Sequence, residues 1–338
     1  MSNIAKSEAV GETRGSRRFL DPAALQKLLA FASLVLLMVY FSIASPAFMQ
    51  EDNMISILQA TAVNGVLAIA STFVIITAGI DLSVGTLMTF CAVMAGVLLT
   101  YLGLPLPIGI VGAIVTGAIS GAVSGTLIAK MKIPPFIATL GMMLVLKGLA
   151  LVVASDKPIY FSDTPGFSSI SQDSVIGDWL LPALPIPNAA LIFLLLAVLA
   201  TFVLNNTSLG RYTFAIGSNE EAVRLSGVNV DRWKIAIYAL SGGICGIAGL
   251  LLASRINSAQ PALGQGYELD AIAAVVIGGT SLSGGAGTIL GTIIGAFIMS
   301  VLTNGLRILS VAQEWQFVVT GIIIILAVYA DMLRKRRN

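Results

Sequence analysis

The chain has 338 residues, of which 57% are apolar and only 11% carry a charge, and its mean hydropathy is +0.93. A soluble globular domain carries about 25% charged residues, so this composition excludes a soluble protein and indicates a polytopic membrane protein. Histidine is absent, which removes the usual general base and the most common metal ligand, and the net charge of +2 points to no particular partner.

Ten apolar segments predict helices that cross a bilayer, a task that needs about 20 residues per helix. They cover residues 26–44, 57–78, 84–102, 107–129, 135–154, 188–204, 235–254, 269–282, 286–304 and 315–331. We therefore expect an all-α polytopic membrane protein with broken or re-entrant segments and a single transmembrane domain over 21–333. Residues 1–20 predict a disordered tail, and 334–338 predict a basic tail. A cleavable signal peptide within 1–45 is the alternative, but its apolar run is long and many spans follow.

The positive charges gather on one side of these spans, as the positive-inside rule requires. With an even number of spans, both termini lie in the cytoplasm together with a basic loop over 205–234. The basic residues assigned to that side are Arg14, Arg17, Arg18, Lys27, Lys130, Lys132, Arg211, Arg224, Arg232, Lys234, Arg334, Lys335, Arg336 and Arg337. The loop 155–186 lies outside and is acidic. Arg255 and Arg307 are exceptions near outer helix ends, where long side chains snorkel.

The motif GIDLSVG at 79–85 lies in one of the most apolar parts of the chain. Its aspartate, Asp81, is the only charged residue between Asp52 and Lys130. An unpaired carboxylate in hydrocarbon costs about 2.5–3.5 kcal/mol even on lenient insertion scales, so Asp81 needs a structural reason.

Two interpretations of this motif stay open. In the first, Asp81 or Ser83 caps the next helix, and Gly79 and Gly85 allow a tight turn at the cytoplasmic end of span two. In the second, the break lies deeper, and Asp81 faces a pathway through the protein or is held by Lys147. The two are compatible if the break is re-entrant.

Other ionisable residues fall inside the predicted spans. Lys147 lies about two-thirds of the way out along span five, where it either snorkels outward or pairs with Asp81 or Asp270. Glu268 and Asp270 lie at the start of span eight, where the helix dipole already favours negative charge.

The segment 218–234, SNEEAVRLSGVNVDRWK, predicts a short capped helix in the basic loop. Ser218 or Asn219 caps it, glutamates fill its first turn, and Gly227 ends it after about two turns. Its small apolar face consists of Ala222, Val223 and Leu225. A helix this short is marginal in water, so it needs a surface. It is either a loop helix at the membrane interface or a docking helix for a cytoplasmic partner.

A second interruption between apolar spans is GGTSLSGGAG at 278–287. Its Thr280, Ser281 and Ser283 can bind backbone groups that are freed where helices end, as irregular backbone at membrane depth requires. If the halves of the fold are related, this break at Gly278 and the one at GIDLSVG both lie near a pathway.

The sequence contains no pattern for catalysis or nucleotide binding. There is no phosphate-binding loop, and the pattern GGICGIAG at 242–249 lies in an apolar helix, where glycines permit close helix packing. Cys91 and Cys245 are far apart within apolar segments, which indicates buried core residues rather than a disulfide or a metal site. We expect no enzyme activity, no metal and no bound nucleic acid.

Three blocks of this sequence resemble the membrane permeases of ribose-type ATP-binding-cassette sugar importers. They are GIDLSVG at 79–85, GRYTFAIGSNEEAVRLSGVNVDRWK at 210–234, and YELDAIAAVVIGGTSLSGGAG at 267–287, within a likeness over about 40–331. The resemblance implies that the short helix is the coupling helix that meets the ATPase. Its positions are Ser218, Asn219, Glu220, Glu221, Ala222, Arg224, Leu225 and Gly227.

The resemblance also implies the other parts of the machine. Two permease copies form the pathway in a bacterial inner membrane, a cytoplasmic ATPase (commonly a tandem chain) holds ATP and Mg²⁺, and a periplasmic binding protein delivers the sugar. This chain then binds no cofactor. The outer loop 155–186 and the segment near Asn257, Gln260 and Pro261 are either docking surfaces for the binding protein or simply solvated loops.

The pathway itself is expected at the two breaks. Its candidate residues are Gly79, Asp81, Ser83, Gly85, Gly278, Thr280, Ser281, Ser283 and Asn64, with Phe73 and Phe90 as candidate aromatics against a sugar ring.

The resemblance points to ribose or a related pentose as cargo. Another monosaccharide, inositol or an autoinducer-type furanose is the alternative within the same machinery. A branched-chain amino-acid permease of similar architecture and a secondary transporter or facilitator are the other classes. Proton coupling usually needs a relay of intramembrane acids or histidines, and this chain has a single deeply placed carboxylate, which disfavours a secondary transporter.

Overall fold

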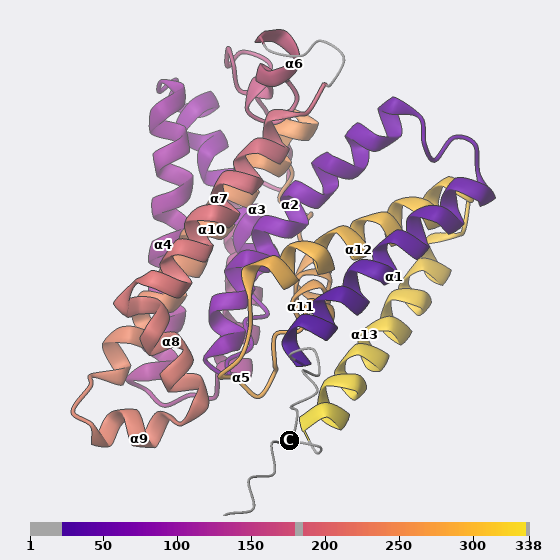
Figure 1. The fold of residues 1–338 in the computed structure, drawn as a ribbon. Helices are drawn as coiled ribbons and strands as arrows, with labels where there is room; N and C mark the ends of the chain where they lie inside the picture. Colours follow the sequence, from indigo (N-terminus) through magenta and orange to yellow (C-terminus); the bar gives the residue numbers. More distant parts are fainter. Residues whose placement is uncertain (1–21, 180–184, 336–338) are drawn as a thin grey trace, which may run out of the picture.

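The computed structural model describes residues 22–179 and 185–335, and it confirms an all-α polytopic membrane protein (Figure 1). Eight of its helices are long and apolar enough to cross a membrane. They are α1 (Pro22–Ala44), α2 (Glu51–Ile76), α3 (Val84–Gly96) with its π-helical continuation η1 (Val97–Tyr101), α4 (Leu106–Ala129), α5 (Pro135–Val153), α7 (Asn188–Asn206), α10 (Val230–Ile256) and α12 (Ile289–Ile308). The last helix, α13 (Gln313–Lys335), contains a shorter apolar stretch.

Helix α10 forms the centre of the bundle and packs against α2, α3 and α4. Glycines set the closeness of its crossing with α4. A Cβ atom added to Gly117 would overlap the carbonyl oxygen of Gly242, one on Gly242 would overlap that of Gly117, and one on Gly121 would overlap that of Tyr238. The prediction that the glycines of 242–249 serve helix packing is therefore confirmed. Both cysteines are buried in this core, as predicted.

The span predicted over 269–282 is instead the short helix α11 (Tyr267–Ile277). Its 11 residues extend about 16 Å, which is roughly half of the 30 Å hydrocarbon core. The helix ends at Ile277 because the glycine-rich segment that follows turns the chain, with Gly279 at a left-handed φ of 95°.

Irregular backbone occupies the place of the missing half-span. The chain leaves α10, forms the two-residue strand β2 (Ser258–Ala259) against β1 (Ile159–Tyr160), and then descends beside α3. The Thr89 hydroxyl donates to the Leu263 carbonyl oxygen at 2.9 Å, and Gly264 packs against Gly85 in the first turn of α3. Such backbone survives inside a membrane protein only where other protein groups surround it. Pro261 and Gly264 are buried in this way, whereas Ala262, Leu263 and Gln265 are exposed. The segment 260–266 and α11 thus form a discontinuous element in place of the predicted helix, and we call 260–266 the re-entrant segment.

The two soluble regions lie at opposite ends of the bundle (Figure 1). One end carries the 3₁₀ turn η2 (Ser168–Ile170) and α6 (Val175–Trp179), within the loop predicted to face outward. The other end carries α8 (Ser208–Ser218) and α9 (Glu220–Leu225), within the basic loop. Arg255 and Arg307 fall in the last turns of α10 and α12, at the helix ends where they were expected.

The predicted tails are only partly described. Residues 1–20, with Arg14, Arg17 and Arg18, lie outside the described residues, as do 336–338. The predicted basic tail begins later than expected, because α13 continues through Lys335.

Candidate coupling and pathway site

Three segments meet at one place, which we call the junction: Ile76–Ala78, directly before GIDLSVG, Gly217–Ser218 and Gly284–Gly285. The Gly285 amide donates a hydrogen bond to the carbonyl oxygen of Ile76, the last residue of α2, at 2.9 Å. Gly217, near the end of α8, packs so closely on the same carbonyl that an added Cβ would overlap it. Gly284 approaches the Ala78 amide and the Gly217 carbonyl. The end of α2, the end of α8 and the glycine-rich break at 278–287 therefore share one contact.

The glycines of GIDLSVG have roles that differ from the predicted ones. The left-handed residue of the turn is Ala78, with φ of 62°, and not a glycine. Gly85 lies inside α3, where it admits the re-entrant segment at Gly264. Gly79 is buried beside Tyr238, and a Cβ added there would lie 2.6 Å from the Tyr238 hydroxyl oxygen. These glycines permit close packing, whereas the turn itself uses an alanine.

Asp81 is buried, and Ser83, two positions further along the chain, supplies its hydrogen bonds. Its Oδ1 accepts hydrogen bonds from the Ser83 amide at 2.8 Å and from the Ser83 hydroxyl at 2.6 Å. Ser83 is the N-cap residue of α3, but its side chain makes no capping hydrogen bond. Asp81 therefore closes the turn before α3 and does not cap the helix in the predicted way.

The same turn is fastened to α5 by Thr139. The Thr139 hydroxyl oxygen accepts from the Leu82 amide at 3.1 Å. The hydroxyl proton can go to the Ile80 carbonyl oxygen at 3.1 Å or to that of Pro135 at 2.9 Å. One side chain thus links the first turns of α5 to both sides of Asp81.

We predict that Asp81→Asn keeps near-normal stability and activity. An asparagine Oδ1 can accept the same two hydrogen bonds from Ser83 without the charge. Asp81→Leu leaves the Ser83 amide and hydroxyl unpaired in the protein interior and is expected to cost about 1–3 kcal/mol. Thermal unfolding in detergent and a transport assay measure both variants. A folded asparagine variant without transport would mean that the charge itself is used.

Lys147 bonds to a partner that the sequence did not predict. Its Nζ donates to the side-chain Oε1 of Gln265 in the re-entrant segment, at 2.8 Å. Within the described part of the chain it forms no ion pair with Asp81 or Asp270. Glu268 behaves more as expected of an acidic residue at a helix start, since both of its carboxylate oxygens lie 3.0 Å from the Gly266 amide, just before α11.

The remaining pathway candidates divide by burial. Phe73 is fully buried in the hydrophobic core, which removes it from contact with a transported molecule in this conformation, and Phe90 is only partly buried against that core. Asn64 Oδ1 and Thr280 Oγ1 are buried and have no hydrogen-bond partner among the described residues. Ser281 accepts weakly from the Ser283 amide at 3.4 Å, which is the backbone role that was predicted for it.

Helix α9 occupies the predicted coupling positions. The Asn219 side chain caps it by accepting from the Ala222 amide at 2.9 Å, whereas Ser218 belongs to α8. Gly227, at φ of 84°, turns the chain after the helix. Leu225 is 79% exposed although it is apolar, so this helix presents an uncovered apolar residue at the end of the molecule.

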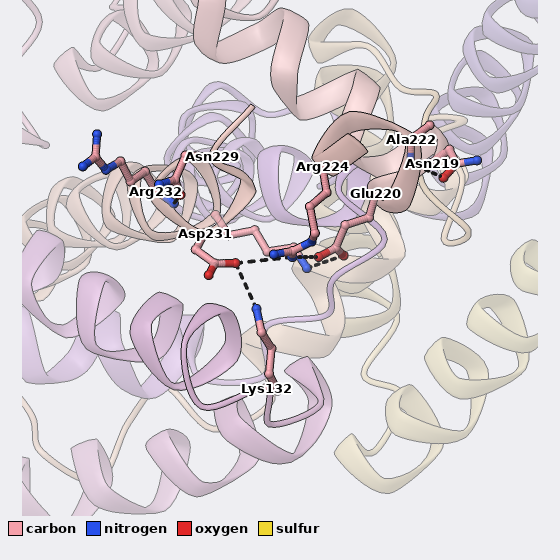
Figure 2. Close-up of polar contacts among 9 residues, drawn as sticks. Lys132, Asn219, Glu220, Ala222, Arg224, Asn229, Asp231 and Arg232 are labelled. Carbon is pink, nitrogen blue, oxygen red and sulfur yellow. Dashed lines mark hydrogen bonds and ion pairs between the residues drawn. The ribbon is translucent and has the colours of Figure 1, made fainter. Parts of the chain in front are cut away.

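A network of ion pairs joins α9 to the start of α10 and to the turn between α4 and α5 (Figure 2). Glu220 pairs with Lys234 of α10 at 2.6 Å and with Arg224 at 3.0 Å. Arg224 also reaches Asp231 in the first turn of α10 at 3.4 Å, and Asp231 pairs with Lys132, in the turn between α4 and α5, at 2.9 Å. Partial burial acts to raise the pKa of the Glu220 carboxyl, but the hydrogen bonds and charges of Lys234 and Arg224 outweigh it and lower that pKa. Glu220 is therefore ionised at neutral pH.

Several residues of this arrangement have no sequence signal of their own. Thr139 and Gln265 are ordinary polar residues, and their partners become visible only in the fold. Lys132 and Asp231 are plain charges in the sequence, and 99 positions separate them. The sequence indicated only that Lys132 and Asp231 have opposite charges and lie on the same predicted side of the membrane.

The sequence matches the family described as "Branched-chain amino acid transport system / permease component" over residues 53–328. The chain belongs to this permease family. This permease is 40% identical over 324 residues to "Ribose import permease protein RbsC" of Escherichia coli (strain K12), covering 95% of this chain and 98% of the relative. The protein of the same name from Bacillus subtilis (strain 168) is 43% identical over 322 residues, covering 95% and 97%.

A further relative is "Xylose transport system permease protein XylH" of Escherichia coli (strain K12), which is 34% identical over 390 residues and covers 100% of this chain and 99% of its own. No solved structure matches the permease. The family assignment confirms a multi-pass membrane protein and a non-catalytic subunit of an ATP-binding-cassette importer, a class that works with an ATPase and a substrate-binding protein.

Proposed function

We propose that this permease forms the translocation pathway for a small sugar, most specifically ribose or a related pentose, in a bacterial inner membrane. The observation that carries the proposal is the similarity to the ribose import permeases of Escherichia coli and Bacillus subtilis, at 40% and 43% identity over 95% of this chain. The xylose relative supports the pentose class over a single sugar.

The coupling part of the proposal rests on α9. The helix and the residues that flank it contact the ATPase, with the exposed Leu225 side chain as the apolar anchor. These residues are Ser218, Asn219, Glu220, Glu221, Ala222, Arg224, Leu225 and Gly227. ATP and Mg²⁺ stay on that ATPase, which we propose is a tandem chain. A second permease copy completes the pathway, and a periplasmic binding protein delivers the sugar to the end that carries α6.

The pathway part of the proposal rests on the discontinuous span. The segment 260–266 and α11 place irregular backbone beside α3, as broken helices do at the binding sites of many transporters. Lys147 and Gln265 bond to each other there, although an intramembrane charge is costly. We propose that the breaks around Asp81 and Thr280 move as this pathway opens.

Reconstitution tests this function. Proteoliposomes that hold the permease and the ATPase encoded beside it, with the neighbouring binding protein added outside, are expected to import radiolabelled ribose only when ATP is enclosed. A hydrolysis-dead ATPase is the control. Ribose uptake that persists with that control would mean a facilitator, and the proposal would be abandoned.

A branched-chain amino acid is the second candidate cargo, because the matching family carries that description. The ligand that the neighbouring binding protein holds separates the two. Leucine or valine in place of a pentose in that protein would reassign the cargo and leave the import mechanism as proposed.

A further inference from the structure

The turn between α4 and α5 lies beside the start of α10, at the same end of the molecule as α9 (Figure 2). Lys132 is held in this turn in a left-handed conformation, with φ of 58°, and its side chain reaches Asp231 of α10 at 2.9 Å. Ile133 comes next, followed by Pro134, the N-cap residue of α5, and Pro135, its first residue. Proline fixes its own φ and restricts the residue before it, so the connection from Lys132 to the first turn of α5 is short and stiff.

We infer that the Lys132–Asp231 ion pair transmits the movement of α9 to α5 and from there to the turn at Asp81. The inference rests on the proposed function, because it concerns how ATP hydrolysis on a partner is converted into opening of the pathway. In this role Lys132 and Asp231 are positioning residues, since they act through other groups.

The route has three connections, each made by at least one side chain. In the first, Arg224 of α9 joins Glu220 to Asp231 of α10. In the second, Asp231 joins Lys132 across the gap to the α4–α5 turn. In the third, Thr139, one turn into α5, bonds to both sides of Asp81.

The junction is a second contact between the loop that carries α8 and α9 and the chain just before Asp81. It connects the end of α8 to the end of α2 through backbone, at Gly217 and Ile76. The turn at Asp81 is therefore held from two directions, by α2 through backbone and by α5 through Thr139. A shift of α9 that moves α5 without moving α2 would strain or release this turn.

The ion pair is exposed enough that it contributes little to stability. The side chains of Lys132 and Asp231 are 58% and 30% exposed, and surface ion pairs have small effects on folding. An ATPase surface that covers α9 excludes water from the network and strengthens these charge interactions at the moment of coupling. Loss of the pair is therefore expected to affect coupling more than folding.

The test uses the reconstituted permease with its ATPase and binding protein, and it measures ribose imported per ATP hydrolysed. Lys132→Gln and Asp231→Asn are each expected to lower this ratio by about fivefold, the factor that corresponds to about 1 kcal/mol. Asp231→Asn also loses the pair with Arg224, so it is expected to be the poorer single variant. The double variant is expected to be no worse than Asp231→Asn alone, because that substitution already removes the pair with Lys132. Lys132→Arg keeps the charge and is expected to keep the ratio.

Lys130→Gln is the matched control. Lys130 precedes the same turn, is exposed, and forms no ion pair within 4 Å in the described part of the chain. Unchanged ratios in the single variants, additive losses in the double variant, or an equal loss from Lys130→Gln would each overturn the inference. Thermal unfolding identifies a variant that merely fails to fold. Absence of ATP-dependent ribose import by the wild-type system would instead overturn the proposed function and this inference with it.

Discussion

Gly217→Val is expected to abolish transport and to destabilise the folded permease by about 3 kcal/mol or more. Gly217 lies near the end of α8, against the carbonyl oxygen of Ile76, and an added Cβ would overlap that oxygen and lie 2.6 Å from the Gly285 amide nitrogen. Both neighbours are backbone atoms, so no flexible side chain can move aside. Separation of these segments also breaks the hydrogen bond from Gly285 to Ile76.

Gly321→Val is the matched control for this substitution. Gly321 also lies in a helix, α13, but no atom outside its own stretch of helix lies within 4 Å of an added Cβ, and valine is a better helix former than glycine, so no loss of stability is expected. Midpoints of thermal unfolding in detergent and ATP-dependent uptake compare the two variants. If Gly217→Val and Gly321→Val have equal unfolding midpoints and equal uptake, close contact at the junction is not needed for stability or transport.

Leu225→Asp and Glu221→Arg are expected to leave the permease folded in the membrane but to separate ATP hydrolysis from uptake. Leu225 is 79% exposed and Glu221 is also exposed, so neither substitution disturbs the core. When the ATPase covers α9, an aspartate at 225 loses an apolar anchor and buries an unpaired charge. Truncating a central interface anchor costs about 2–4 kcal/mol, which predicts a fall in coupled transport of about 30-fold or more.

Leu225→Met is the conservative control, because it keeps an apolar side chain of similar volume and is expected to retain most transport. Ribose uptake and ATP hydrolysis are measured together in the reconstituted system. Normal coupled uptake by both the aspartate and the arginine variants would exclude α9 as the ATPase contact.

Local sequence predicted α9 closely. A cap residue, an acidic first turn and a glycine after the last turn act within a few positions of one another. The interactions that start and end this helix are therefore local, and the sequence pattern is enough to predict them. The structure chose Asn219 over Ser218 as the cap because the two residues belong to different helices. The acidic first turn acquired a second role through Lys234, which lies 14 positions further along the chain.

The sequence showed that the helix breaks at Asp81, but it did not show which residues surround this carboxylate. A single charge in a long apolar stretch indicates a break, because burying an unpaired charge in hydrocarbon costs free energy. Its surroundings come from Ser83 next to it, Thr139 on α5 and Tyr238 on α10. Two of these three are far away in sequence, and no local pattern predicts them.

The sequence by itself determined the helical class, the approximate spans and the permease family, because hydrophobic length and local motifs suffice for these. Only the tertiary structure decided that α11 is half a span, that Phe73 is buried, and that Lys147 bonds to Gln265. It also decided that Gly217, Gly285 and Ile76 meet. The reason is that bilayer thickness acts on each segment separately. The tertiary contacts instead join segments that are far apart in the sequence, such as Ile76 and Gly285, and they depend on how whole helices cross.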